Sequence, residues 1–197
     1  MPFQHHLRSL LTLFQVSYED EFFSVIGIKS TTPKTTTVKG SAAPYDPYTP
    51  VINRLLSLTA TDFELLTQHL LDAMGFEETQ HTGQTGDKGI DALGTLTASG
   101  LIRVRLYVQA KRYKADQVID VNTVKNFRGS IPKDAQGAFI ATCSFHKKAY
   151  EEAARPGFTP VTLINGRQLV DLLAEYWTSI PEEVQEQLAL KQGLFLK

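Results

Sequence analysis

The chain has few of the residues that build covalent or metal cross-links. Its 197 residues include one cysteine, Cys143, which excludes an intrachain disulfide and is typical of a protein of the reducing cytosol. The five histidines show no metal-ligand spacing with that cysteine, so a structural zinc site is not expected. Stability must therefore come from a packed core, and 42% hydrophobic residues are enough to build one.

Long apolar runs and an excess of positive charge are also missing. No apolar run approaches the length that crosses a membrane, and the N-terminus lacks the pattern of a cleavable signal. We therefore expect a soluble cytoplasmic protein with no membrane partner. The formal net charge of -1 argues against a uniformly basic coat for nucleic acid. A local basic groove is still compatible with it, because the shape of the field matters more than the sum.

Residues 85–111 contain two alternating runs joined by a turn signal, a pattern that predicts a β-hairpin. In the second run Gln109 and Lys111 share one strand face, because side chains alternate with period two. In the first run Asp91 points opposite to an apolar face, which consists of Ile90, Ala92, Gly94 and Leu96. The hairpin therefore brings a carboxylate, an amide and an ammonium group around one small volume.

This set of groups suits hydrolysis of a phosphodiester, whose transition state gathers negative charge and whose attacking water needs activation. The Asp91 carboxylate, the Gln109 side-chain oxygen and the Ala110 carbonyl are the hard oxygen ligands that Mg²⁺ prefers, with Mn²⁺ as an alternative ion. Lys111 would orient the nucleophile and contact the phosphate. The residues alone leave a plainer alternative open, in which Asp91 is a solvated acid near a turn and Lys111 begins an exposed basic run.

The segment GDKGIDALG, followed by QAKRY with its glutamine eighteen residues after Asp91, resembles the catalytic core of the Mrr-type restriction endonucleases. This family is a branch of the PD-(D/E)xK nuclease superfamily in which a glutamine replaces the usual acid. Flanking segments also match, in the expected order. TDFELLTQHLLDAMGF resembles the opening helix, AFIATCSFHKKAYEEA a later strand and helix, and VTLINGRQLVDLL the closing strand and helix. The resemblance covers residues 56–175.

The resemblance implies an α/β restriction-endonuclease-like layered fold, with a central mixed β-sheet flanked by helices. It implies Mg²⁺-dependent cleavage of double-stranded DNA by a type IV restriction endodeoxyribonuclease, with modified (methylated) DNA as the target. It assigns catalysis to Asp91, Gln109 and Lys111. The apolar run of residues 137–141 predicts a buried parallel strand of this sheet. A helical stripe before it consists of Val118, Val121, Val124 and Phe127.

The opening helix is predicted to begin after Ala60 and to end at Gly75, with an apolar stripe along one face. Thr61 and Glu64 fit the capping box S/T-x-x-E, in which the glutamate bonds back to the backbone of the capping residue. The resemblance gives Glu64 a second, catalytic interpretation, because in the family an acid at this place lies near the metal. Both interpretations stay open. The stripe consists of Phe63, Leu66, Leu70 and Met74.

Cations surround the predicted site. The run Arg112, Tyr113 and Lys114 interleaves positive charges with an aromatic ring, a pattern that can bind DNA phosphates. Lys88, at the end of a glycine-rich loop, is expected to contact DNA with them. Lys88 and Ala92 stand where the family tends to have glycine, and Lys88 adds bulk and charge close to the proposed metal.

Residues 1–55 differ in composition from the rest of the chain. HLRSLLTLFQV and FFSVIGI predict a helix and a strand, and residues 30–50 form a Thr/Pro-rich linker. This segment is too short for a core of its own, so we expect it to pack on the nuclease domain or on another subunit. A remnant of a DNA-recognition domain is the alternative. The predicted division is thus 1–55 and an Mrr-like nuclease domain at 56–197, in a homodimer or higher homo-oligomer.

Two other functions stay open at this point. A junction-resolving nuclease of the same fold would prefer four-way junctions over linear duplex. A DNA-binding or assembly module that has lost catalysis is the other, because Lys88 and the neutral Gln109 both weaken the case for cleavage. A cleavage assay with a divalent metal separates it from a nuclease.

Overall fold

A computed structural model of the chain describes residues 46–82 and 89–190. Its centre is a five-stranded sheet in the order β1-β2-β3-β5-β7. These strands are β1 (Glu77–His81), β2 (Ala92–Ala98), β3 (Ile102–Lys111), β5 (Gln136–Ala141) and β7 (Val161–Ile164). A small second sheet pairs β4 (Val118–Ile119) with β6 (Ser144–Phe145).

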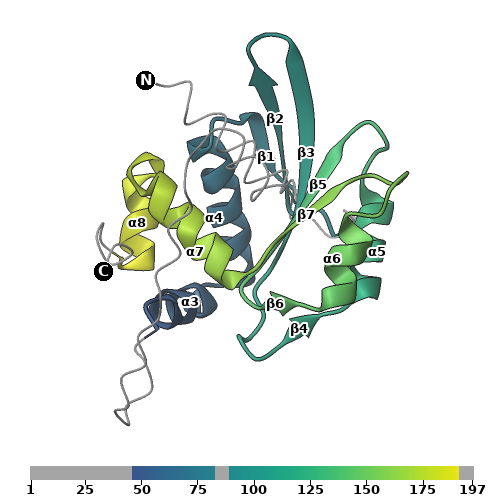
Figure 1. The fold of residues 1–197 in the computed structure, drawn as a ribbon. Helices are drawn as coiled ribbons and strands as arrows, with labels where there is room; N and C mark the ends of the chain where they lie inside the picture. Colours follow the sequence, from purple (N-terminus) through teal and green to yellow (C-terminus); the bar gives the residue numbers. More distant parts are fainter. Residues whose placement is uncertain (1–45, 83–88, 191–197) are drawn as a thin grey trace, which may run out of the picture.

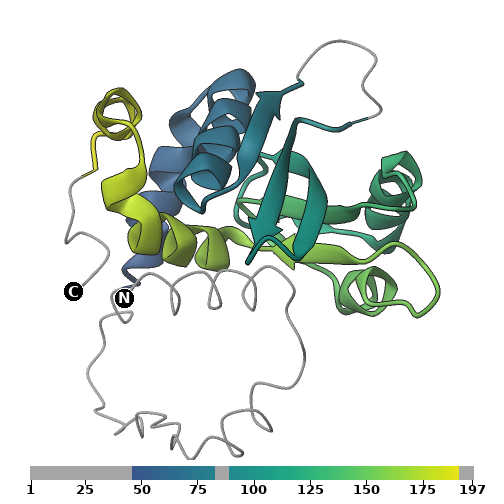
Figure 2. The same ribbon diagram turned by 90° about the horizontal axis from the view of Figure 1, so that it is seen from above.

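Helices cover both faces of the large sheet, so the molecule has three layers (Figures 1 and 2). One layer contains α3 (Tyr48–Ser57), α4 (Ala60–Ala73), α7 (Gly166–Tyr176), the short 3-10 helix η1 (Trp177–Ser179) and α8 (Glu182–Leu188). The layer on the other face contains α5 (Val121–Ser130) and α6 (Lys147–Ala153). The predicted α/β layers around a mixed sheet are confirmed. None of the described helices is long and apolar enough to cross a membrane.

Strands β2 and β3 form the predicted hairpin. They pair antiparallel, with Ala92 opposite Val108 at one end and Ala98 opposite Ile102 at the other. The turn connects Ala98 to Ile102. Strand β3 then pairs parallel with β5, and Lys111 lies opposite Ala141, the last residue of β5. The end of β3 therefore coincides with the carboxyl end of a parallel strand, which is where open α/β sheets place their ligands.

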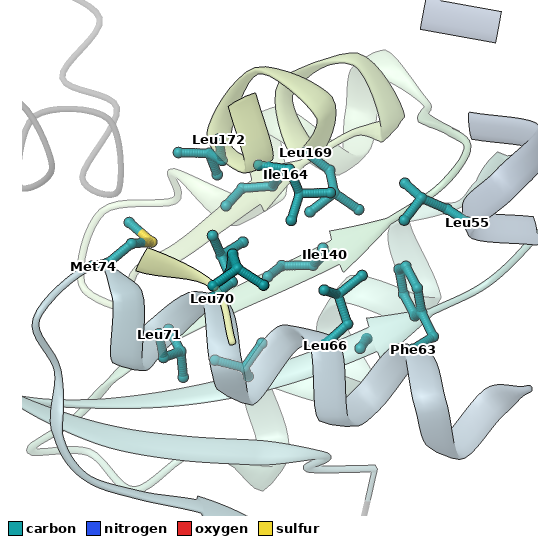
Figure 3. Close-up of a cluster of buried hydrophobic side chains, with 14 of the residues drawn as sticks. Leu55, Phe63, Leu66, Leu70, Leu71, Met74, Ile140, Ile164, Leu169 and Leu172 are labelled. Carbon is teal, nitrogen blue, oxygen red and sulfur yellow. The ribbon is translucent and has the colours of Figure 1, made fainter. Parts of the chain in front are cut away.

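Alternation along the central strands divides the core into two clusters. The larger cluster packs α3, α4, α7 and α8 onto one sheet face, where Leu106 and Val108 are at most 2% exposed. Figure 3 shows the apolar side chains of α4 directed toward those of the sheet and α7. The smaller cluster lies between the opposite face and α5 and α6. In it Phe139 meets Phe127 and Phe145 edge to face, at centroid distances of 5.4 and 5.6 Å.

Helix α3 extends the packed unit toward the N-terminus. Its residues Val51, Ile52 and Leu55 are buried in the larger cluster. The last residues of the predicted linker therefore belong to a helix, and the packed unit begins before the predicted boundary at residue 56. The helix and strand predicted within residues 1–29 lie outside the described residues.

Helix α4 has its predicted apolar stripe, but its cap is not the predicted one. The Thr59 hydroxyl accepts a hydrogen bond from the Asp62 N–H at 3.1 Å, and the Asp62 carboxylate accepts one from the Thr59 N–H at 3.3 Å. The capping box of Thr61 with Glu64 was wrong, because the same spacing occurs two residues earlier and the helix starts there. The side chain of Glu64 is thus engaged elsewhere. The helix predicted from Val118 likewise begins only at Val121, since Val118 belongs to β4.

Candidate active site

Three of the predicted catalytic residues meet at the carboxyl end of β3. Asp91 lies just before β2, whereas Gln109 and Lys111 belong to the last three residues of β3. The Lys111 Nζ is 3.6 Å from Asp91 Oδ2, and the Ala110 N–H donates to the same oxygen at 2.8 Å. Asp91 and Gln109 are 7% and 9% exposed, while the Lys111 side chain is 31% exposed. The carboxylate and amide are therefore buried, and the ammonium group remains accessible.

Backbone hydrogen bonds fix Asp91 between β1 and β3. Its N–H donates to the Val108 carbonyl at 2.8 Å, and its carbonyl accepts from the Thr82 N–H at 3.0 Å. The Thr82 hydroxyl also donates to the Ile90 carbonyl at 2.6 Å. Ile90 packs with the smaller cluster, so its predicted place on the apolar face with Ala92 was wrong. The alternation of β2 begins only at Ala92.

The fold leaves the negative charge of Asp91 incompletely compensated. Burial raises the pKa of the Asp91 carboxyl above its usual value, and the negative charge of Glu64 raises it further. The Ala110 N–H and the Lys111 ammonium lower the pKa without cancelling the effect of burial. A bound cation would supply the missing positive charge.

Glu64 and His81 form a pair beside Asp91 that the sequence did not predict. Glu64 Oε2 lies 3.1 Å from His81 Nε2, and the two side chains are 18% and 22% exposed. His81 ends β1 opposite Ala92, the residue that follows Asp91. The charge of Glu64 raises the pKa of Asp91, so the two carboxylates are close enough to interact. No pattern in the sequence singled out His81.

The oxygen donors at this site fit a divalent ion. In residues 46–82 and 89–190, no three His, Cys, Asp or Glu side chains are grouped to hold a metal. The ligands would therefore be the Asp91 carboxylate, the Gln109 amide oxygen and the Ala110 carbonyl, a set of hard oxygens that suits Mg²⁺ or Mn²⁺. Gly89 leaves room for the amide, because a Cβ there would lie 2.4 Å from Gln109 Nε2.

The predicted DNA-contacting residues have different environments. The Arg112 Nη1 donates to the Leu56 carbonyl, one of the last carbonyls of α3, so this arginine has a structural contact that was not predicted. Tyr113 and Lys114, which follow Arg112, are exposed. Lys88 lies outside the described residues.

Ala92 stands where the family tends to have glycine. It is completely buried in the larger cluster. Its methyl group therefore packs in the core and takes no space from the carboxylate of Asp91.

A layered fold with an acid, a glutamine and a lysine at the end of one hairpin defines a nuclease of the restriction-endonuclease type. In agreement, the profile of the restriction endonuclease family, of the Mrr catalytic type, matches residues 55–173, and the chain belongs to this family. A curated relative, the type IV methyl-directed restriction enzyme EcoKMrr of Escherichia coli (strain K12), is 31% identical over 131 residues. The match covers 64% of this chain and 41% of the relative.

Two solved structures share the fold. The DNA modification-dependent restriction endonuclease AspBHI has a TM-score of 0.59 and 22% identity, covering 86% of this chain and 47% of that protein. The MspJI restriction endonuclease, in complex with a 27-mer oligonucleotide, has a TM-score of 0.57 and 17% identity, covering 81% and 40%. The chain spans less than half the length of these relatives. Restriction nucleases of this family generally use divalent metal ions.

Proposed function

We propose that the chain is the catalytic domain of a metal-dependent endonuclease that cuts modified double-stranded DNA. The observation that carries the proposal is the meeting of Asp91, Gln109 and Lys111 at the end of β3 in a chain of the restriction endonuclease family. Modified DNA as the target is supported by two relatives, since EcoKMrr is methyl-directed and AspBHI is modification-dependent. A cytoplasmic location and a homo-oligomeric assembly are parts of the same proposal.

The roles of the site residues follow from their chemistry. Asp91, Gln109 and the Ala110 carbonyl would hold Mg²⁺ or Mn²⁺. When bound, such an ion stabilises charge on the phosphate and lowers the pKa of a coordinated water. Lys111 is accessible and close to Asp91, so its ammonium group contacts the scissile phosphate and orients the nucleophile.

Glu64 and His81 support this site from the side of α4. Glu64 adds a second negative charge close to Asp91, which makes a cation more favourable there. His81 is a positioning residue, because its contact at 3.1 Å restricts the carboxylate of Glu64. Tyr113 and Lys114, with Lys88, contact the DNA backbone next to the scissile phosphate.

Cleavage of methylated and unmethylated plasmid with Mg²⁺ or Mn²⁺ tests this function. We expect cleavage of the methylated plasmid that requires the ion and is lost in Lys111→Ala. No cleavage of either plasmid with either ion would contradict the nuclease proposal. Equal cleavage of both plasmids would contradict the modified target, and a preference for four-way junctions over linear duplex would assign a junction-resolving nuclease instead.

A further inference from the structure

A basic cleft lies at the end of the sheet opposite to the candidate active site. Its volume is about 900 Å³, and it lies between α5, α6 and the loops that precede β5 and β7. Figure 1 shows these two helices together on one side of the sheet. The loops that line the cleft lead into the starts of β5 and β7, whereas Lys111 pairs with the last residue of β5. The six residues of β5, at about 3.3 Å each, therefore separate the cleft from Lys111 by about 20 Å.

The lining of the cleft is strongly positive. It contains four cations and one acid, Glu152, in a chain whose formal net charge is -1. Such a concentration of like charge destabilises the folded state unless an anion offsets it, and it attracts anions from solution. The four cations are Lys125, Arg128, Lys133 and Arg155.

Two arginines and a phenylalanine form one wall of this cleft. Arg128 Nη1 lies 2.8 Å from Glu152 Oε1, and Arg155 Nη1 lies 3.9 Å from the same oxygen. The guanidinium group of Arg155 also lies over the Phe158 ring, 4.4 Å from its centroid, and that of Arg128 lies 5.4 Å from it. One carboxylate is thus shared by two guanidinium groups, which leaves a net positive charge at this wall.

The two lysines of the cleft complement this wall. Lys125 and Lys133 are exposed, and neither forms an ion pair within the described part of the chain. A lysine ammonium is a compact point charge with three donors, and an arginine is a planar fork of donors. Both suit phosphate oxygens. Arg128 is buried and donates to Glu152, so the accessible donors of the cleft belong to Lys125, Lys133 and Arg155.

We propose that this cleft binds phosphate groups, separately from the candidate active site, from either a DNA backbone or a free nucleotide. The site extends the proposed function, because at about 20 Å from Lys111 it adds affinity and takes no part in phosphodiester cleavage. Failure of the cleft proposal can be distinguished from failure of the nuclease proposal, since binding and cleavage are measured independently. A parent chain that binds through the cleft and does not cut would contradict only the nuclease.

The test removes the two unpaired lysines in Lys125→Ala/Lys133→Ala. The matched control is Lys147→Ala/Lys148→Ala, which removes the same charge from exposed positions of α6 outside the cleft lining. Binding of a short fluorescent duplex is measured over a range of salt concentrations, and ATP binding is measured by calorimetry. Thermal unfolding checks that both variants are folded, which is the expected result for exposed positions.

If a DNA backbone occupies the cleft, the slope of log K against log salt falls by about 1.8 in the cleft variant, because each lost phosphate contact accounts for about 0.9. The control keeps the parent slope. If a free nucleotide is the source, ATP binding is lost in the cleft variant and the duplex slope does not change. Unchanged binding of both probes overturns the proposal.

Lysine acetylation of the unsubstituted protein, read by mass spectrometry, tests the same site without any variant. We expect bound duplex or ATP to protect Lys125 and Lys133, and Lys147 and Lys148 to react as in the free protein. Equal reactivity of Lys125 and Lys133 with and without both probes would overturn the proposal.

Discussion

Replacing Gly89 by Ala tests whether the position of the Gln109 amide matters. Gly89 has a φ of +77°, and a Cβ there would lie 2.4 Å from Gln109 Nε2. An ordinary contact needs about 3.5 Å, so the amide has to move by about 1 Å. Gln109 is only 9% exposed, and a shift of its side chain displaces the oxygen that is proposed to hold the metal.

Two effects of this substitution can be given magnitudes. An alanine in the left-handed region costs about 1–2 kcal/mol of stability. A displacement of about 1 Å in a catalytic group lowers the rate about 100-fold, which equals about 2.7 kcal/mol of transition-state stabilisation. The cleavage rate should therefore fall much more than the loss of stability alone would cause.

Gly100→Ala is the matched control. Gly100 has a φ of +67°, and no atom lies within 4 Å of the position of its Cβ. The control therefore has the same backbone strain and leaves Gln109 in place. Single-turnover cleavage at saturating Mg²⁺ and thermal unfolding are measured for both variants. We expect similar losses of stability and slow cleavage only in Gly89→Ala; equal cleavage rates would refute the role of the amide.

The remaining predictions concern a carboxylate, an arginine and the glutamine itself. Asp91→Asn should be more stable than the parent at neutral pH, because the contribution of the Asp91 carboxyl to stability is fully present below its usual pKa of 3.8 and is lost as pH rises through its raised pKa. A thermal advantage of the variant that does not grow from acidic to neutral pH would contradict this. Arg112→Ala should lower the free energy of unfolding by about 1–3 kcal/mol, because the Leu56 carbonyl loses its donor, and denaturant unfolding should show no such loss for the exposed Lys114→Ala. Gln109→Glu should lower the Mg²⁺ concentration that half-saturates cleavage, since a carboxylate binds the ion more tightly than an amide; an unchanged or higher value would exclude residue 109 as a ligand.

Much of the fold could be predicted because its patterns are local. Alternation placed Gln109 and Lys111 on one strand, and the stripe of Phe63 and Leu66 marked the buried face of α4. The run of residues 137–141 was apolar on both faces, as a parallel strand covered by helices must be. These features depend on neighbours in the sequence, which the sequence itself displays.

The contacts between elements could not be predicted in the same way. Glu64 and His81 lie on a helix and an edge strand, and their meeting depends on how α4 packs on β1. Arg112 reaches the end of α3, although the cationic run around it suggested only phosphate contacts. The choice of Thr59 as the helix cap also depended on where the chain enters the core. No periodicity encodes any of these distances.

The central claim is that Asp91 binds a divalent ion, and calorimetry tests it most directly. Mg²⁺ and Mn²⁺ are titrated into the unsubstituted chain, Asp91→Ala and the exposed Lys114→Ala, with no DNA present. We predict binding to the parent and to Lys114→Ala, and a sharp loss of affinity in Asp91→Ala, because this substitution removes the buried carboxylate beside Lys111. Undiminished binding of both ions to Asp91→Ala would contradict the site.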